Sequence, residues 1–113
     1  MTWEGRVASS SGSVGRGANF LSMSPQAVAA RWRERGFSCH PHTDAPHQEW
    51  HDLADSRDEL VFVLSGELEV QIEGVTHAMR AGDELLIPAN ARHSSKAGEE
   101  PVELLYGYRG ENV

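Results

Sequence analysis

Two ionisable side chains, Glu59 and His93, stand beside stretches of the sequence that favour β structure. Glu59 opens an apolar run that ends at Gly66, and His93 follows a second run that is punctuated by Gly82 and Pro88. Carboxylates and imidazoles both bind divalent transition metals, and adjoining strands can hold such ligands rigidly. We therefore expect the two side chains to converge inside a β-barrel and to form part of a metal site.

Two further residues could complete this site. If the chain before Glu59 stays extended, residues 47, 49, 51, 53 and 55 point the same way, so His51 and Asp55 would share one face. A set of His51, Glu59 and His93 would form the two-histidine, one-carboxylate triad of non-haem iron oxygenases. A set of Asp55, Glu59 and His93 would be richer in oxygen and would favour harder ions. The sequence leaves both alternatives open.

The elements that must position these residues begin with a helix. Ser24 can cap it, Pro25 suits its first turn and Gly36 ends it. Its apolar residues lie mostly on one side, so we expect the helix to pack on the outside of a sheet. We expect a single domain in three parts: an N-terminal arm or loop over residues 1–23, the helix over 24–36 and a β-barrel over 37–113.

Beyond the helix, the apolar pattern alternates with a period of two. Leu68, Val70 and Ile72 are the clearest case, because polar residues separate them as in a half-solvated antiparallel strand. About eight short strands at close spacing predict a sandwich or barrel. Besides the strand that follows Glu59, we expect strands over residues 37–43, 47–53, 67–73, 75–80, 83–87, 93–96 and 102–108.

The strand after Glu59 is apolar on both of its faces. Val61 and Val63 alternate with Leu60, Phe62 and Leu64, so one face would line the barrel and the other needs a cover. The helix, the N-terminal arm or a second subunit could provide that cover. We expect a homodimer.

Composition limits the possible partners. With 10 Lys and Arg against 17 Asp and Glu, the formal charge of -7 argues against binding to nucleic acid. Cys39 is the only cysteine, so no intrachain disulfide can form, which suits a reducing compartment. The sequence shows no apolar leader and no stretch long enough to cross a bilayer. We expect a cytoplasmic protein without a membrane partner.

From about Gly36 to Tyr108 the sequence resembles the cupin family. The end of the first cupin motif matches as Glu59 followed, after six residues, by Gly66, and the second motif matches as Gly82, Pro88 and His93. The segments around Trp50–Leu53, Asp58–Leu60 and Leu105–Tyr108 are similar to those of a subgroup of small one-domain cupins. The resemblance implies an all-β cupin jelly-roll, a double-stranded antiparallel β-barrel, with one N-terminal α-helix and a metal ion in the barrel mouth.

The sequence departs from the cupin motifs where the metal should bind. The paired histidines of the first motif are replaced by Leu53 and Asp55. In the second motif Asn90 replaces a glycine, which is a mild change because Asn tolerates a left-handed backbone, and Ala97 replaces an asparagine. Of the family's ligands only Glu59 and His93 remain, with Asp55 as a plausible substitute for one histidine.

Two functions follow from these features. In the first, Fe, Mn, Ni or Zn held by Glu59 and His93, together with Asp55 or His51, serves an oxygenase, isomerase or lyase acting on a small molecule. In the second, the barrel mouth is a non-catalytic small-molecule-binding or sensory site with weak or no metal binding. The candidates for lining a ligand pocket are Trp50, Phe62, Tyr106 and Tyr108, whereas His40 and His42, which flank Pro41, are expected to face solvent.

Overall fold

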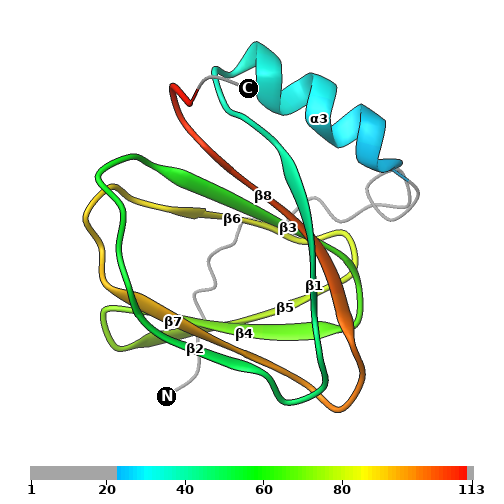
Figure 1. Ribbon diagram of the computed structural model, residues 1–113, viewed down its shortest axis with the longest axis vertical. Coiled ribbons are helices and arrows are strands. Elements are labelled where there is room, and N and C mark those ends of the chain that lie inside the picture. The colour runs from blue at the N-terminus through cyan, green and yellow to red at the C-terminus, as the bar shows by residue number, and fades with distance from the viewer. Residues whose placement is uncertain (1–22, 112–113) are drawn as a thin grey trace.

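Two antiparallel four-stranded sheets face each other in the computed structural model, which describes residues 23–111 (Figure 1). The strand order is β1-β8-β3-β6 in one sheet and β2-β7-β4-β5 in the other. The predicted all-β architecture with one helix is confirmed; the N-terminal arm lies, except for Met23, outside the described residues. The strands are β1 (His40–Asp44), β2 (Glu49–Leu53), β3 (Glu59–Ser65), β4 (Glu67–Ile72), β5 (Val75–Arg80), β6 (Glu84–Ile87), β7 (His93–Ala97) and β8 (Val102–Tyr108).

Helix α3 (Pro25–Glu34) lies within the range predicted from the sequence, residues 24–36, with Ser24 as its N-cap. The hydroxyl of Ser24 accepts a hydrogen bond from the backbone N–H of Ala27 at 3.1 Å, and proline occupies the first turn. At the other end Gly36 adopts a φ of 87°, a left-handed conformation that glycine reaches without strain. Within the described residues no helix is both long and apolar enough to span a membrane.

Helix α3 covers the outer face of the first sheet. Trp32 is fully buried there, and its indole N–H donates a hydrogen bond to Glu84 of β6 at 2.9 Å. The helix therefore provides a cover for the second apolar face of β3, and that face needs no second subunit. The homodimer stays a prediction. The buried residues of this outer cluster are Val28, Trp32, Phe37, Leu60, Phe62 and Leu105.

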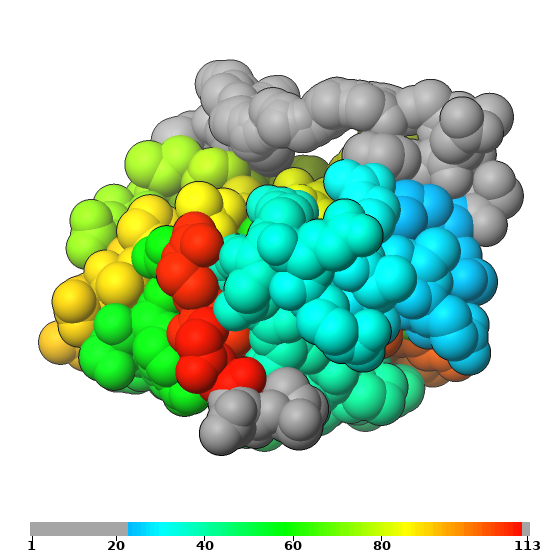
Figure 2. All heavy atoms as spheres, turned by 90° about the horizontal axis from the view of Figure 1, so that it is seen from above, coloured from blue at the N-terminus to red at the C-terminus, as the bar shows by residue number. Residues whose placement is uncertain are grey.

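The end of β8 lies against the segment that follows the helix. Phe37 pairs with Arg109, and the backbone N–H of Gly110 donates to the carbonyl of Gly36 at 2.8 Å. Figure 2 shows this contact, with the C-terminal end of the described chain in red beside cyan residues. A Cβ on Gly107 would lie only 1.8 Å from the carbonyl oxygen of Ser38, so this close approach requires glycine.

The opposite face of β3 points between the two sheets. Val61 and Val63 pack there against residues of the second sheet. This inner core holds the barrel together, yet it leaves space at the end where β3 and β7 begin. Its buried residues are Val61, Val63, Leu68, Val70, Met79, Leu85, Ile87, Ala91, Ala97, Val102 and Leu104.

The regular alternation expected before Glu59 is wrong, because β2 contains an irregularity. The pairing of β2 with β7 shifts between Trp50 and Leu53, and Asp52 adopts a left-handed φ of 57°. As a result Trp50 and Leu53, which are three positions apart, both reach the space between the sheets. His51 falls on the outer side of this bulge.

Candidate functional site

A cavity of about 250 Å³ opens between the two sheets. Its wall combines residues of both sheets, and half of them lie on β3, β7 and β8. Of the four aromatic residues predicted as candidates to line a pocket, only Phe62 lies elsewhere, in the cluster under the helix. The lining residues are His42, Asp44, Trp50, Leu53, Glu59, Val61, Leu68, Val70, Ile87, His93, Ser95, Leu104, Tyr106 and Tyr108.

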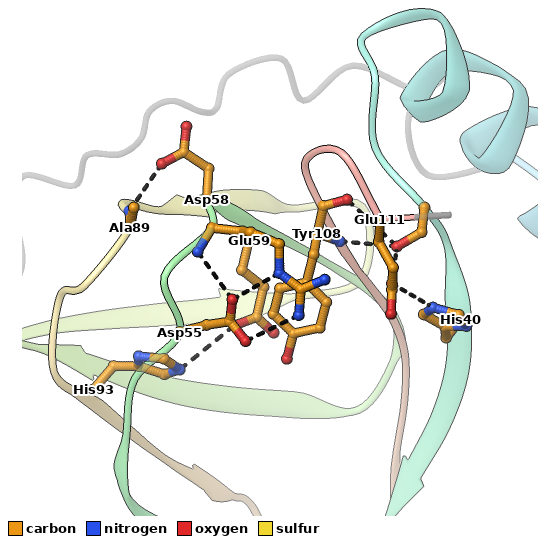
Figure 3. Close-up of polar contacts among 10 residues, drawn as sticks. His40, Asp55, Asp58, Glu59, Ala89, His93, Tyr108 and Glu111 are labelled. Carbon is orange, nitrogen blue, oxygen red and sulfur yellow. Dashed lines mark hydrogen bonds and ion pairs between the residues drawn. The ribbon is translucent and has the colours of Figure 1, made fainter. Parts of the chain in front are cut away.

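Glu59 and His93 meet across this cavity. Glu59 begins β3 in the first sheet, and His93 begins β7 in the second. The Nε2 atom of His93 lies 3.5 Å from Oε1 of Glu59, and the two side chains are only 7% and 12% exposed (Figure 3). The structure thus brings the two side chains together in a sheltered place, as the sequence led us to expect. Their role as metal ligands stays a prediction.

A backbone carbonyl fixes the tautomer of His93. The Nδ1 atom lies 3.0 Å from the carbonyl oxygen of Ala91, which can only accept, so Nδ1 carries a proton. In the neutral ring Nε2 therefore has a free lone pair that faces Glu59. A proton on Nε2 turns this contact into a charge-assisted one, and the neighbouring Glu59 raises the pKa of His93 above its ordinary value, against the opposing effect of burial.

The turn that leads to His93 is held by two aspartates, Asp58 through its carboxylate and Asp55 through its backbone carbonyl. Asp58 accepts a hydrogen bond from the backbone N–H of Ala89 at 2.8 Å and another from Arg109, and these donors lower the pKa of Asp58. The backbone carbonyl of Asp55 accepts from the N–H of Asn90. Asn90 adopts a φ of 66°, which confirms that asparagine takes up the left-handed conformation there.

Asp55 lies near the pair, but its carboxylate is already engaged. Both of its oxygens accept from the guanidinium of Arg57, at 2.9 and 3.2 Å. This ion pair lowers the pKa of Asp55. Burial, together with the charges of Glu59 and Asp55, raises the pKa of Tyr108 to about 12. The charge of Asp55 also contributes, after Glu59, to raising the pKa of His93. Figure 3 shows Asp55 beside Glu59 and Tyr108.

His51 lies away from the cavity. Its side chain is 69% exposed, and its Nε2 atom lies 2.8 Å from Oε1 of Glu49, a residue that is itself on the surface. The bulge at Asp52 is the physical reason, because it breaks the alternation on which the grouping of His51 with Glu59 depended. The structure does not bring His51 to Glu59 and His93.

The described residues do not fit the metal centre that the family resemblance implies. Within residues 23–111, no group of three or more His, Cys, Asp or Glu side chains is arranged to hold a metal ion. Glu59 and His93 provide two donors, and a transition-metal site needs at least three. Asp55 is paired with Arg57 and His51 points outward, so neither supplies the third.

A second polar group lines the cavity at its other end, and the sequence pattern did not lead us to expect it. Asp44 at the end of β1 is 2% exposed, and its Oδ1 atom lies 2.8 Å from Nε2 of His42 and accepts from the indole N–H of Trp50 at 3.1 Å. His42 was expected to face solvent, yet it lines the cavity. The alternation of His40, His42 and Asp44 on the inner face of β1 was the signal that could have found it.

Two curated proteins are similar in sequence to part of this chain. Dimethylsulfoniopropionate lyase DddW from Ruegeria pomeroyi is 42% identical over 50 residues, which is 44% of this chain and 33% of that protein. Polyketide synthase CurC from Streptomyces cyaneus is 36% identical over 50 residues, or 43% of this chain and 32% of that protein. The matched part of this chain spans about a third of the length of either relative.

The fold is also found in solved structures. The crystal structure of the DMSP lyase DddQ from Ruegeria pomeroyi superposes with a TM-score of 0.62 at 21% identity, over 67% of this chain and 39% of that one. At this identity the likeness concerns the fold alone. The family model of the cupin domain matches residues 37–108, which contain all eight strands and both the Glu59 and the His93 motifs. The chain therefore belongs to the cupin superfamily, as a Cupin_2 domain.

Proposed function

We propose that this protein binds a small organic molecule in the cavity between its two sheets, with Glu59 and His93 as the polar contacts. The observation that carries the proposal is the cavity of about 250 Å³ into which this buried pair points from opposing sheets. Binding sites for small molecules are typically concave and mostly apolar, with a few well-placed polar groups. The cavity has this character, since valine, leucine and isoleucine make up much of its wall.

The pair offers a ligand both kinds of polar contact. Protonated His93 donates through Nε2, and the carboxylate of Glu59 accepts. Because the two groups lie 3.5 Å apart, one ligand group could contact both of them. This function does not require the divalent ion that the family resemblance implies, because the described residues offer such an ion only two donors where it needs at least three.

Ligand-induced stabilisation tests the proposal. We expect some members of a panel of small neutral, acidic and basic organic molecules to raise the melting temperature, and titration calorimetry to give one site per chain. At a concentration of one hundred times Kd, the stabilisation should be about 2.7 kcal/mol. A panel without any stabilising member would contradict the proposal.

A pair of adjacent serines provides a matched control. Ser95 lines the cavity, so Ser95→Phe should fill part of it and abolish binding. Ser94 precedes it on β7 and does not line the cavity, so Ser94→Phe should bind like the wild type. Equal binding by both variants would place the ligand elsewhere on the protein.

A second candidate function is an elimination reaction of the lyase type. Two observations favour it: the identity of 42% with a dimethylsulfoniopropionate lyase over 50 residues, and the lone pair that neutral His93 directs into the cavity. In such a reaction Nε2 of His93 takes a proton from carbon. The C–H electron pair then forms a double bond, and the leaving group departs with the electrons of its own bond.

Loss of dimethylsulfoniopropionate, followed by nuclear magnetic resonance, tests the second candidate. We expect the wild type to consume it and His93→Gln to lose at least a hundredfold in rate, because general-base catalysis contributes about 10²–10⁴. His51→Gln removes an imidazole outside the cavity and should keep the wild-type rate. If the wild type leaves the compound intact, this candidate is wrong and the binding proposal is unaffected.

A further inference from the structure

Three aromatic rings gather at the end of the cavity that lies farther from Glu59. The ring of His42 is 6.1 Å from that of Trp50 and 6.2 Å from that of Tyr106, measured between centroids, and both contacts are edge-on. Trp50 is 40% exposed, so its indole forms part of the rim of the cavity. Its position is nevertheless fixed, because the indole N–H is bound to Asp44.

Asp44 brings a buried carboxylate to these rings. Its side chain is only 3% exposed, and it lines the same cavity. A carboxylate removed from water is costly unless a positive charge or several hydrogen bonds compensate it. The indole of Trp50 is a neutral donor, and His42 is 39% exposed. Neither residue supplies the permanent positive charge of a lysine or arginine.

The residues that line the cavity carry more negative than positive charge. No lysine or arginine is among the described residues that line it. Arg57 stacks on the ring of Tyr108, with its Cζ atom 4.6 Å from the centroid, but it lies outside the lining and is neutralised by Asp55. Glu59 is opposed by His93 at the other end. Asp44 contacts the imidazole of His42 in the same way, at 2.8 Å, but no permanent cation among the described residues lies beside it, and of the two carboxylates it is the one next to the aromatic rings.

From these observations we infer the chemical class of the ligand: a small organic cation, of the quaternary ammonium or sulfonium type, whose charged group binds against Trp50 and Tyr106 near Asp44. This inference rests on the proposed binding function and deepens it. Aromatic faces attract weakly hydrated cations, tryptophan most strongly, and the attraction grows when water is excluded. Asp44 positions the indole and adds a negative charge without needing to touch the ligand.

The length of the cavity suits an elongated ligand that carries a different chemical group at each end. Along β8, His42 lies opposite Leu104 and Glu59 lies opposite Tyr108. Four residues of an extended strand span about 13 Å. The cation at one end would therefore leave room along the apolar wall for a short chain that leads towards Glu59 and His93.

A comparison of three probes of nearly equal shape tests the inference. Choline carries a trimethylammonium group, 3,3-dimethylbutan-1-ol is its neutral carbon analogue, and 3,3-dimethylbutanoate carries a negative charge. We would measure their binding by titration calorimetry at pH 8 and low salt, above the ordinary titration range of histidine. We expect choline to bind at least tenfold more tightly than the alcohol, and the acid to bind least.

Three variants show whether this preference arises at the rings and Asp44. Asp44→Asn keeps the shape of the side chain and removes its charge. Trp50→Phe retains a ring but weakens the aromatic contact with a cation. Each variant should reduce the preference for choline over the alcohol at least threefold. Glu49→Gln removes a carboxylate from the outside of β2, and the preference should stay unchanged. Circular dichroism establishes that each variant is folded, and Trp50→Phe still tests the inference if Asp44→Asn is not.

The outcomes separate the inference from the binding function. If the alcohol or the acid binds as tightly as choline, the ligand is not a cation, while binding in the cavity stands. The cation is equally ruled out if other small molecules bind and choline does not, or if Glu49→Gln lowers the preference as much as Asp44→Asn. If no small molecule binds, the binding function itself is wrong.

Discussion

The two faces of β3 show how differently one strand can be used. On the outer face Leu60 and Phe62 are sealed under α3 with Trp32, and each is at most 3% exposed. On the inner face Val61 is buried as well, but it borders the cavity along with Glu59 from the same strand. The outer face is thus packed for stability, whereas the inner face leaves part of its packing unfilled at the mouth of the barrel.

This difference predicts that substitutions on the two faces have different effects. Dense packing penalises any loss of volume, because neighbouring atoms cannot fully close the gap. A residue that borders an existing cavity has fewer contacts to lose. Stability should therefore respond most to residues under the helix, and ligand binding most to residues on the cavity wall.

The largest effect is expected for Trp32→Ala. Removing this buried ring should lower the free energy of unfolding by about 3–5 kcal/mol, because it leaves a large void and deprives Glu84 of its indole donor. Leu104→Ala, on the cavity wall, should cost about 2 kcal/mol, near the lower limit for such a change. Urea denaturation measures both, and an equal cost would remove the distinction between the faces.

The metal affinity of the inner face can be increased by restoring the histidines of the first cupin motif. Asp55→His should strengthen the binding of Ni(II) or Zn(II) at least tenfold, about 1.4 kcal/mol, because it adds a third donor beside Glu59 and His93 and removes the partner of Arg57. Leu53→His tests the other motif position in the same way.

Metal analysis of untagged protein and titration calorimetry provide the readout. We expect the wild type to lose metal on dialysis against EDTA without any fall in melting temperature. A stoichiometric metal ion in the wild type that is lost in Glu59→Ala would contradict this expectation and would show that Glu59 is a metal ligand.

The stability provided by the inner pair should depend on pH. The folded protein raises the pKa of His93 above its unfolded value, so the contribution of the pair is fully present below the unfolded pKa of about 6.5. It is lost as the pH rises through the raised pKa of the folded state. Glu59→Gln should therefore cost about 1 kcal/mol at pH 6 and clearly less at pH 9, as measured by urea denaturation at each pH. The same cost at both pH values would show that His93 takes no part.

The smallest effect is expected outside the barrel. His51 and Glu49 form the same chemical pair as His93 and Glu59, and at 2.8 Å their contact is shorter, yet both side chains are largely in solvent. His51→Ala should change stability by less than about 0.5 kcal/mol and leave ligand binding unchanged. A larger loss would mean that the outer surface of β2 has a partner.

Local signals and motif spacing predicted much of this structure. The limits of the helix follow from Ser24, Pro25 and Gly36, and the strand after Gly66 follows from its alternating apolar residues. The approach of Glu59 to His93 was predicted from motif spacing, although the two belong to different sheets.

The residues at both ends of the cavity are placed by local features that a strictly alternating strand pattern cannot predict. The bulge at Asp52 reverses the expected orientation of His51 and brings Trp50 inward. Asp55 has the spacing of a ligand, but Arg57, two residues further on, takes up its carboxylate. Asp44 ends β1, a proline-containing edge strand on which solvent-facing side chains are expected. Its burial depends on Trp50 of the other sheet.

The bulge in β2 also has a consequence for how such a pocket can be changed. Among the strands of residues 23–111, β2 is the outermost of its sheet and pairs with β7 alone, so a shift in its register disturbs one of these neighbours only. Moving the extra residue one position along the strand would exchange the side chains offered to the interior, while the other seven strands keep their partners. A single insertion or deletion in this strand is therefore a short route to a new ligand preference on an unaltered scaffold.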